Sequence, residues 1–144
     1  MRVYIIEDVE LMLEVVHSYV SSLEGMEIVG EAEDGMVAMN EIAALKPDLV
    51  LTDINLPEVN GLEILYLLKR KYPQMRVVLF TGSITRERVK LAYEGGADGF
   101  IEKSADLTEF RNAIEALSSG QRYFGGPAKH HLGAILADSG SFEA

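Results

Sequence analysis

The chain has 144 residues, of which 48% are hydrophobic and 25% charged, and this length and composition are typical of one globular domain. Its 23 acidic and 13 basic residues give a formal net charge of −10, which argues against nucleic-acid or anionic-membrane binding by this chain itself. It contains no cysteine, which excludes disulfides, thiolate metal sites and cysteine nucleophiles, and no apolar run approaches the roughly 20 residues of a membrane helix. We therefore expect a cytoplasmic domain whose stability comes from packing.

Five short apolar runs alternate along the chain with five segments of helical period. The runs are rich in β-branched residues and predict strands at 3–6, 27–32, 49–52, 77–81 and 99–101. After each run, apolar residues recur three and four apart, and these stripes predict helices over 11–23, 37–45, 62–72, 89–93 and 107–117. The predicted order is therefore (βα)5.

Three of the predicted strands are almost entirely apolar, as expected when helices cover both faces of a parallel sheet. The second run, 27–32, is more mixed in polarity and is expected at a sheet edge. Right-handed crossovers then predict an α/β fold, a doubly wound five-stranded parallel sheet in a three-layer α/β/α sandwich. Ligands bind such sheets in the crevice at the carboxyl ends of the strands.

The periodic pattern fades after Ser118. Glycines and one proline interrupt the rest, at 120, 125, 126, 127, 133 and 140, so we predict a C-terminal linker or tail over 119–144 with at most a short helix. These residues are too few for a second domain, and the folded domain is expected to span 1–118.

Polar side chains gather where four of the predicted strands end. Glu7 and Asp8 follow the first strand, Asp53 the third, Thr81 ends the fourth and Lys103 follows the fifth. Three carboxylates at one edge repel one another, and Lys103 is the only basic residue of the set. Mg²⁺ would relieve this repulsion, because it prefers oxygen ligands from carboxylates, water and phosphate.

The same set suits phosphoryl transfer. Lys103 offers a positive charge and Thr81 a hydroxyl donor for phosphate oxygens, while Asp53 could act as the nucleophile that forms an aspartyl phosphate. The added charge of roughly −2 could then move a nearby loop, so the site has the chemistry of a switch.

Four motifs give this chain a family resemblance. They are Glu7-Asp8, residues 51–57 (LTDINLP) followed by Asn60-Gly61, residues 80–83 (FTGS), and residues 96–103 (GADGFIEK). In order and position they resemble the receiver domain of bacterial two-component response regulators, a CheY-like, flavodoxin-like fold, and the likeness covers residues 1 to about 118. The family's strand order, 2-1-3-4-5, is taken over with the resemblance.

The resemblance implies a role for each matching residue. Asp53 matches the phosphoacceptor, which takes a phosphoryl group from a sensor histidine kinase or a phosphotransfer protein. Glu7, Asp8, Asp53 and the backbone carbonyl of Asn55 match the Mg²⁺ ligands, Thr81 and Lys103 the switch hydroxyl and the phosphate-binding lysine, and Phe100 the aromatic switch. Such a chain is a phosphoacceptor switch rather than an enzyme, with self-catalysed phosphorylation, slow autodephosphorylation and a homodimer expected on phosphorylation.

The chain departs from the family pattern at three positions. Many members have Asp where Glu7 stands, Tyr in place of Phe100, and Pro in place of Ser104 after the lysine. The last difference leaves the geometry of the Lys103–Ser104 peptide bond open, because a cis bond without proline costs about 3 to 4 kcal/mol.

Residues 116–124 (ALSSGQRYF), together with Ser104, resemble the stretch that precedes a DNA-binding output domain in the NarL/FixJ, or LuxR-type, group. We expect no output domain within the remaining residues, because they are too few to form it. Two interpretations remain, a piece of a transcription regulator and a stand-alone relay that acts by protein contacts.

Two further functions compete with the switch. Asp53-Ile54-Asn55 is similar to the D-x-D of haloacid-dehalogenase-type phosphatases, although an amide at Asn55 cannot protonate a leaving group. A scaffold that does not respond to phosphate is the other alternative.

Overall fold

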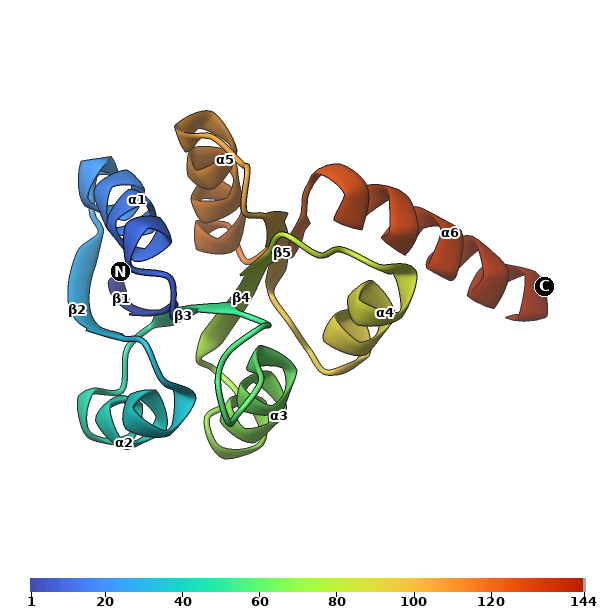
Figure 1. Cartoon of the computed structure of the whole chain (residues 1–144). Coiled ribbons are helices and arrows are strands. Elements are labelled where there is room, and N and C mark those ends of the chain that lie inside the picture. Colours follow the sequence, from blue (N-terminus) through green and yellow to red (C-terminus); the bar gives the residue numbers. More distant parts are fainter. Residues whose placement is uncertain (144) are drawn as a thin grey trace.

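Six parallel strands form one open sheet with helices on both faces (Figure 1). The structure, a computed structural model, describes residues 1–143, with side chains described as far as Asp138. The strands are β1 (Arg2–Ile6), β2 (Glu27–Ala32), β3 (Leu49–Asp53), β4 (Arg76–Thr81), β5 (Gly99–Glu102) and β6 (Tyr123–Phe124). The helices are α1 (Glu10–Ser22), α2 (Gly35–Leu45), α3 (Gly61–Lys71), α4 (Arg86–Glu94), α5 (Leu107–Ser118) and α6 (Gly126–Glu143).

The sheet has the order β2-β1-β3-β4-β5-β6, with every pairing parallel. The predicted (βα)5 doubly wound sheet and its strand order are confirmed, and β2 lies at an edge as its mixed pattern indicates. The largest difference among the five predicted helices is at α4, which begins at Arg86, before its apolar stripe starts.

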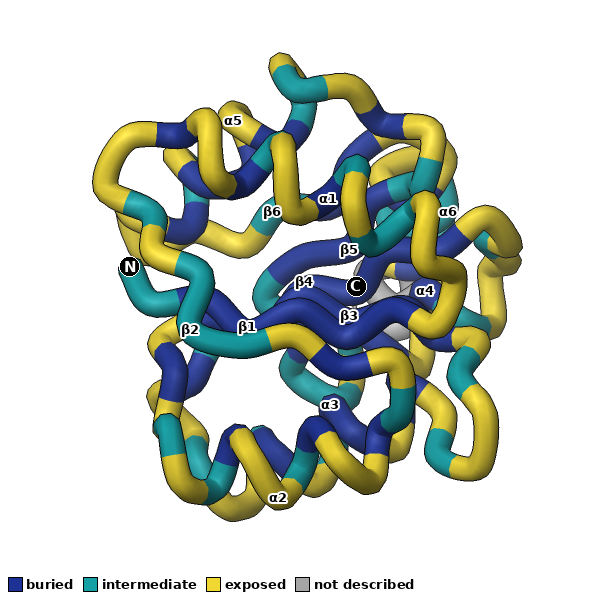
Figure 2. Tube along the Cα trace, turned by 60° about the vertical axis from the view of Figure 1, so that its left-hand side comes forward, coloured by how far each residue is buried: buried dark blue, intermediate teal, exposed yellow. Residues whose placement is uncertain are grey.

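Alternate residues of the strands serve two separate cores. In β1, Val3 and Ile5 pack with α1 and α5, whereas Tyr4 and Ile6 pack with α2, α3 and α4 on the other face. This alternation follows from the period of two in a strand, and all four side chains are fully buried. Figure 2 shows the buried strands as a dark layer between helices whose outer faces are exposed.

Four helices begin at side-chain caps. Asp34, Asn60, Thr85 and Asp106 precede α2, α3, α4 and α5, and each accepts a hydrogen bond from a backbone N–H in the first turn. Each of these helices is the next element after a strand, so the caps help to fix the loops at the carboxyl edge of the sheet.

The prediction of a tail with at most a short helix is wrong. Residues after α5 add the sixth strand, β6, to the edge of the sheet, and α6 then runs for 18 residues alongside α4 (Figure 1). Ala128, Leu132 and Ile135 recur at helical spacing and pack into the core that also contains Val89 of α4. The last residue of the predicted tail, Ala144, lies outside the described residues.

The prediction of a tail failed because Pro127 and Gly133 occupy positions in α6 where they are tolerated. Pro127 lies in the first turn of α6, where a missing N–H breaks no intrahelical bond. Gly133 faces open space, so it costs α6 only the intrinsic propensity difference from Ala, about 1 kcal/mol. Among the described residues, no helix is both long and apolar enough to span a membrane.

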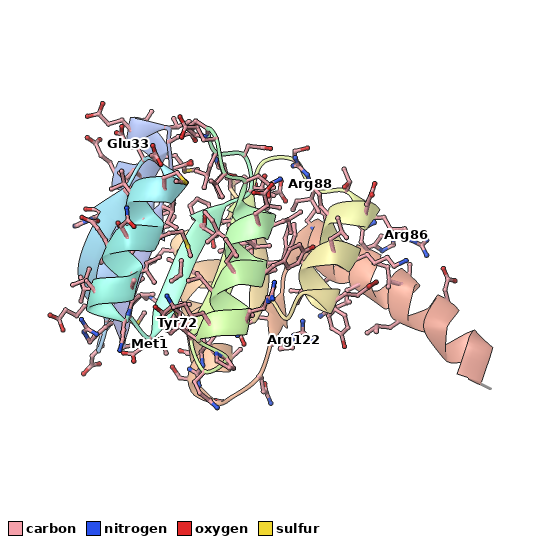
Figure 3. All side chains as sticks on the ribbon, turned by 90° about the horizontal axis from the view of Figure 1, so that it is seen from below. Met1, Glu33, Tyr72, Arg86, Arg88 and Arg122 are labelled. Atoms are coloured by element: carbon pink, nitrogen blue, oxygen red, sulfur yellow. The ribbon has the colours of Figure 1, made fainter. Side chains whose placement is uncertain are left out.

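Aromatic contacts attach the added strand to the rest of the fold. The ring of Phe124 stacks on Phe100 of β5 at a centroid distance of 6.1 Å and meets Tyr93 of α4 edge-on at 5.9 Å. The guanidinium of Arg122 lies 3.9 Å from the Tyr93 ring centroid and donates to the backbone carbonyls of Tyr93 and Ala97 (Figure 3). Residues 122–124 are therefore packed against the rest of the fold, with Phe124 in its core.

We predict that Phe124→Ala lowers the free energy of unfolding by about 3 kcal/mol, because it removes a buried ring and leaves a cavity. Leu136→Ala, which truncates a 44% exposed residue of α6, is the control and should change the free energy of unfolding by less than about 0.5 kcal/mol. Urea unfolding followed by circular dichroism measures both. Equally small effects would contradict the packing of β6 against the sheet.

Candidate functional site

The site is built where β1 and β3 end side by side. Ile6 pairs with Thr52, so Glu7, one residue on, lies level with Asp53. Both follow runs of buried residues, and both are themselves buried, with exposed fractions of 0% for Glu7 and 1% for Asp53. Two carboxylates are thus held close together away from water.

Lys103 reaches these carboxylates from the end of β5. Its Nζ lies 2.6 Å from Oε1 of Glu7 and 2.7 Å from Oδ2 of Asp53. Its backbone N–H donates to the carbonyl of Thr81 at 3.0 Å, and this bond fixes the backbone of Lys103 beside the end of β4. One ammonium therefore joins groups from three strands.

Asp8 completes the acidic cluster at the surface. Its side chain is exposed, and its backbone N–H donates to Oε2 of Glu7 at 3.0 Å. Carboxylate oxygens of Glu7, Asp8 and Asp53 all lie within 4.8 Å of one another. When all three are ionised, Lys103 leaves two negative charges uncompensated, and this oxygen-only set fits a hard divalent cation such as Mg²⁺.

Burial and charge repulsion act on the protonation of the cluster. Burial, with the neighbouring charge of Asp53, raises the pKa of Glu7 to about 7 despite the opposing contact with Lys103. Burial alone would lower the pKa of Lys103, but its ion pairs with Asp53 and Glu7 outweigh this and raise it. Lys103 is therefore a permanent cation, whereas Glu7 titrates near neutrality.

Asn55, on the loop after β3, and Thr81, the last residue of β4, flank the cluster. The backbone N–H of Asn55 donates to Oδ1 of Asp53 at 3.2 Å. Thr81 is fully buried at the end of β4, and its hydroxyl oxygen accepts the N–H of Ser83 at 3.3 Å. The remaining sequence-predicted residue, Phe100, points into the core, where its ring stacks on Phe124 rather than lying among the carboxylates.

Gly61 lets α3 begin directly behind Asp53. A Cβ at this position would lie 2.1 Å from the carbonyl oxygen of Asp53, and the N–H of Gly61 donates to Ile54 at 2.8 Å. The first turn of α3 thus presses against the strand end that carries the carboxylate. The peptide bond between Lys103 and Ser104 is trans, as are all bonds in the described part of the chain.

Sequence reasoning missed Arg88 of α4. Its guanidinium donates to Oδ1 of Asn55 and to the carbonyl of Ser83, both at 2.8 Å. The only signal in the sequence is its place in the first turn of the helix that follows Thr81, and many exposed arginines share such a place.

Comparison with known proteins gives a family match. The model of the response regulator receiver domain matches residues 3–115. The response regulator protein VraR of Staphylococcus epidermidis is 31% identical over 123 residues, which are 85% of this chain and 59% of that protein. The chain thus spans about three fifths of the length of this curated relative.

Solved structures agree in fold. A two-component response regulator of the LuxR family from Aurantimonas sp. SI85-9A1 superposes with a TM-score of 0.87 at 26% identity, covering 94% of this chain and 97% of that one. The signal receiver domain of the putative response regulator NarL from Mycobacterium tuberculosis gives a TM-score of 0.77 at 31% identity, covering 83% and 97%.

We predict that Glu7→Gln stabilises the metal-free protein at pH 8 but not at pH 5. The folded-state pKa of about 7 exceeds the ordinary 4.5, so the wild type loses stability as the pH rises through this range. Glu7→Gln should raise the free energy of unfolding by about 1 to 3 kcal/mol at pH 8 and leave it nearly unchanged at pH 5. Urea unfolding in chelator at both pH values measures it, with Glu10→Gln, an exposed neighbour, as control. A less stable Glu7→Gln protein at pH 8 would contradict the electrostatics of the cluster.

Proposed function

This chain belongs to the response regulator receiver domain family of two-component systems, and on that premise we propose that it is switched by phosphorylation of Asp53. The observation that carries the proposal is the contact of one ammonium, Lys103, with two buried carboxylates from different strands. A phosphoryl group on Asp53 would bring oxygens to this ammonium, which is already held in place for them.

Asp53, Lys103 and Thr81 each have a different role in the phosphoryl transfer. A carboxylate oxygen of Asp53 attacks the phosphorus of a phosphohistidine, the P–N bond breaks, and the imidazole leaves with its electron pair, so that a mixed anhydride remains. Lys103 then holds one phosphoryl oxygen, and the hydroxyl of Thr81 turns from Ser83 to donate to another.

A divalent cation fits the acidic cluster. Glu7, Asp8, Asp53 and the backbone carbonyl of Asn55 would hold Mg²⁺, which when bound supplies charge neutralisation for the incoming phosphoryl oxygens. Because the free cluster has excess negative charge, cation binding also favours the ionised form of Glu7.

The proposed output passes through Phe100. Its ring contacts Phe124, so an altered position of Phe100 would change the packing of β6 and α6. We propose residues 1–118 as the receiver and 119–144 as the segment that conveys the change to a DNA-binding partner domain. The LuxR-family name of one structural relative supports this output, and a stand-alone relay is the alternative.

The partners follow from this chemistry. A sensor histidine kinase or phosphotransfer protein supplies the phosphoryl group, and a second copy of the chain binds after phosphorylation. The net charge of −10 supports protein partners rather than direct contact of this chain with nucleic acid. We propose that this exchange takes place in the cytoplasm, in keeping with a chain that lacks cysteine.

We predict that acetyl phosphate or phosphoramidate with Mg²⁺ adds one phosphoryl group per chain, measured by intact-mass spectrometry. Asp53→Asn should add none, because an amide cannot form the anhydride. Asp106→Asn is the matched control and should gain mass like the wild type, since asparagine caps α5 as well as aspartate does.

Equal mass gain by Asp53→Asn would exclude Asp53 as the phosphoacceptor. Steady release of phosphate over many turnovers from a phosphate ester would instead favour the phosphohydrolase.

A further inference from the structure

Arg88 joins the two loops that border the phosphorylation site. It lies in the first turn of α4, where its backbone N–H donates to the capping hydroxyl of Thr85 at 3.2 Å. From there Nη2 reaches Oδ1 of Asn55, on the loop between β3 and α3, and Nη1 reaches the carbonyl of Ser83, on the loop between β4 and α4. The planar fork of an arginine suits two acceptors at once.

Each residue that Arg88 contacts also faces the site. Asn55 donates its backbone N–H to Asp53 and offers its side-chain oxygen to Arg88. Ser83 donates its backbone N–H to the hydroxyl of Thr81 and offers its carbonyl to Arg88. Arg88 is thus one residue removed from both the phosphoacceptor and the hydroxyl, and it ties their two loops together.

Arg86 shows that this arrangement is specific to one arginine of α4. It carries the same charge on the same helix, but its guanidinium pairs with Asp138 of α6. In Figure 3, Arg88 lies by the loop that leads into α4, whereas Arg86 lies on the side of α4 that faces α6. Positive charge on α4 alone therefore does not define the contact between the loops.

We propose that Arg88 is a positioning residue that holds the two loops together over Asp53 and so limits the access of water to the aspartyl phosphate. The inference rests on the proposed function and adds a determinant of the phosphoryl lifetime. In the step that Arg88 slows, a water oxygen attacks phosphorus, the bond between phosphorus and the Asp53 oxygen breaks, and the products are the free carboxylate and inorganic phosphate.

Loss of the Arg88 guanidinium should therefore shorten the half-life of the aspartyl phosphate. The 144-residue chain is phosphorylated with acetyl phosphate and separated from the donor, and the decay of the phosphorylated mass is then followed in Mg²⁺. Arg88→Ala should shorten the half-life by about threefold or more, the low end of couplings between groups in direct contact. Asn55→Ala should act similarly because it removes one of the two anchors.

Three further variants distinguish a role of Arg88 in positioning the loops from a general effect on the stability of the fold. The double variant Arg88→Ala with Asn55→Ala should decay no faster than the faster single variant, since both break one connection. Arg88→Lys, whose single ammonium cannot replace the fork, should restore the half-life only in part. Arg86→Ala removes the matched charge and should keep the wild-type half-life, and thermal unfolding should show Arg88→Ala as stable as Arg86→Ala.

The possible failures are distinct. An unchanged half-life in Arg88→Ala, or multiplicative effects in the double variant, would overturn the role of Arg88 and leave the proposed function standing. A wild-type chain that gains no phosphoryl mass would overturn the proposed function, and this inference with it.

Discussion

Three carboxylates share one ammonium at the carboxyl edge of the sheet, and the rest of the site depends on this imbalance of charge. Lys103 contacts Glu7 and Asp53 at hydrogen-bonding distance, and Asp8 lies close enough to share a ligand with them. Because Glu7 and Asp53 are buried, the repulsion within this cluster destabilises the free protein unless a proton or a cation binds to it. The raised pKa of Glu7 reflects this destabilisation, because burial and the charge of Asp53 both disfavour its ionised form.

The fold holds the cluster together through contacts that involve little charge. Strand register brings Glu7 level with Asp53, and Gly61 lets α3 pack directly behind Asp53. Capped helices then fix the loops that carry Asn55 and Ser83. A phosphoryl group at Asp53 would meet groups that are already in position, which is how preorganised sites stabilise charge.

The sequence predicted the parts of the molecule that depend on local pattern. Apolar runs marked the five main strands, and the strand ends then identified Glu7, Asp53 and Lys103, because parallel strands finish at one edge. The sequence did not predict α6, because its glycines and proline read as breaks, although Gly126 and Pro127 lie at its start and Gly133 faces open space. Arg88 was missed because one of its two partners, Asn55, lies far away in the sequence on the loop after β3, and no local spacing records such a contact.

Mg²⁺ titration by isothermal calorimetry at pH 8, where Glu7 is largely ionised, tests the charge imbalance most directly. We expect one ion per chain, with affinity lowered about tenfold or more in Asp8→Asn and unchanged in Glu10→Gln, a nearby acid outside the cluster. Saturable binding that survives Asp8→Asn, or no binding by the wild type, would contradict it.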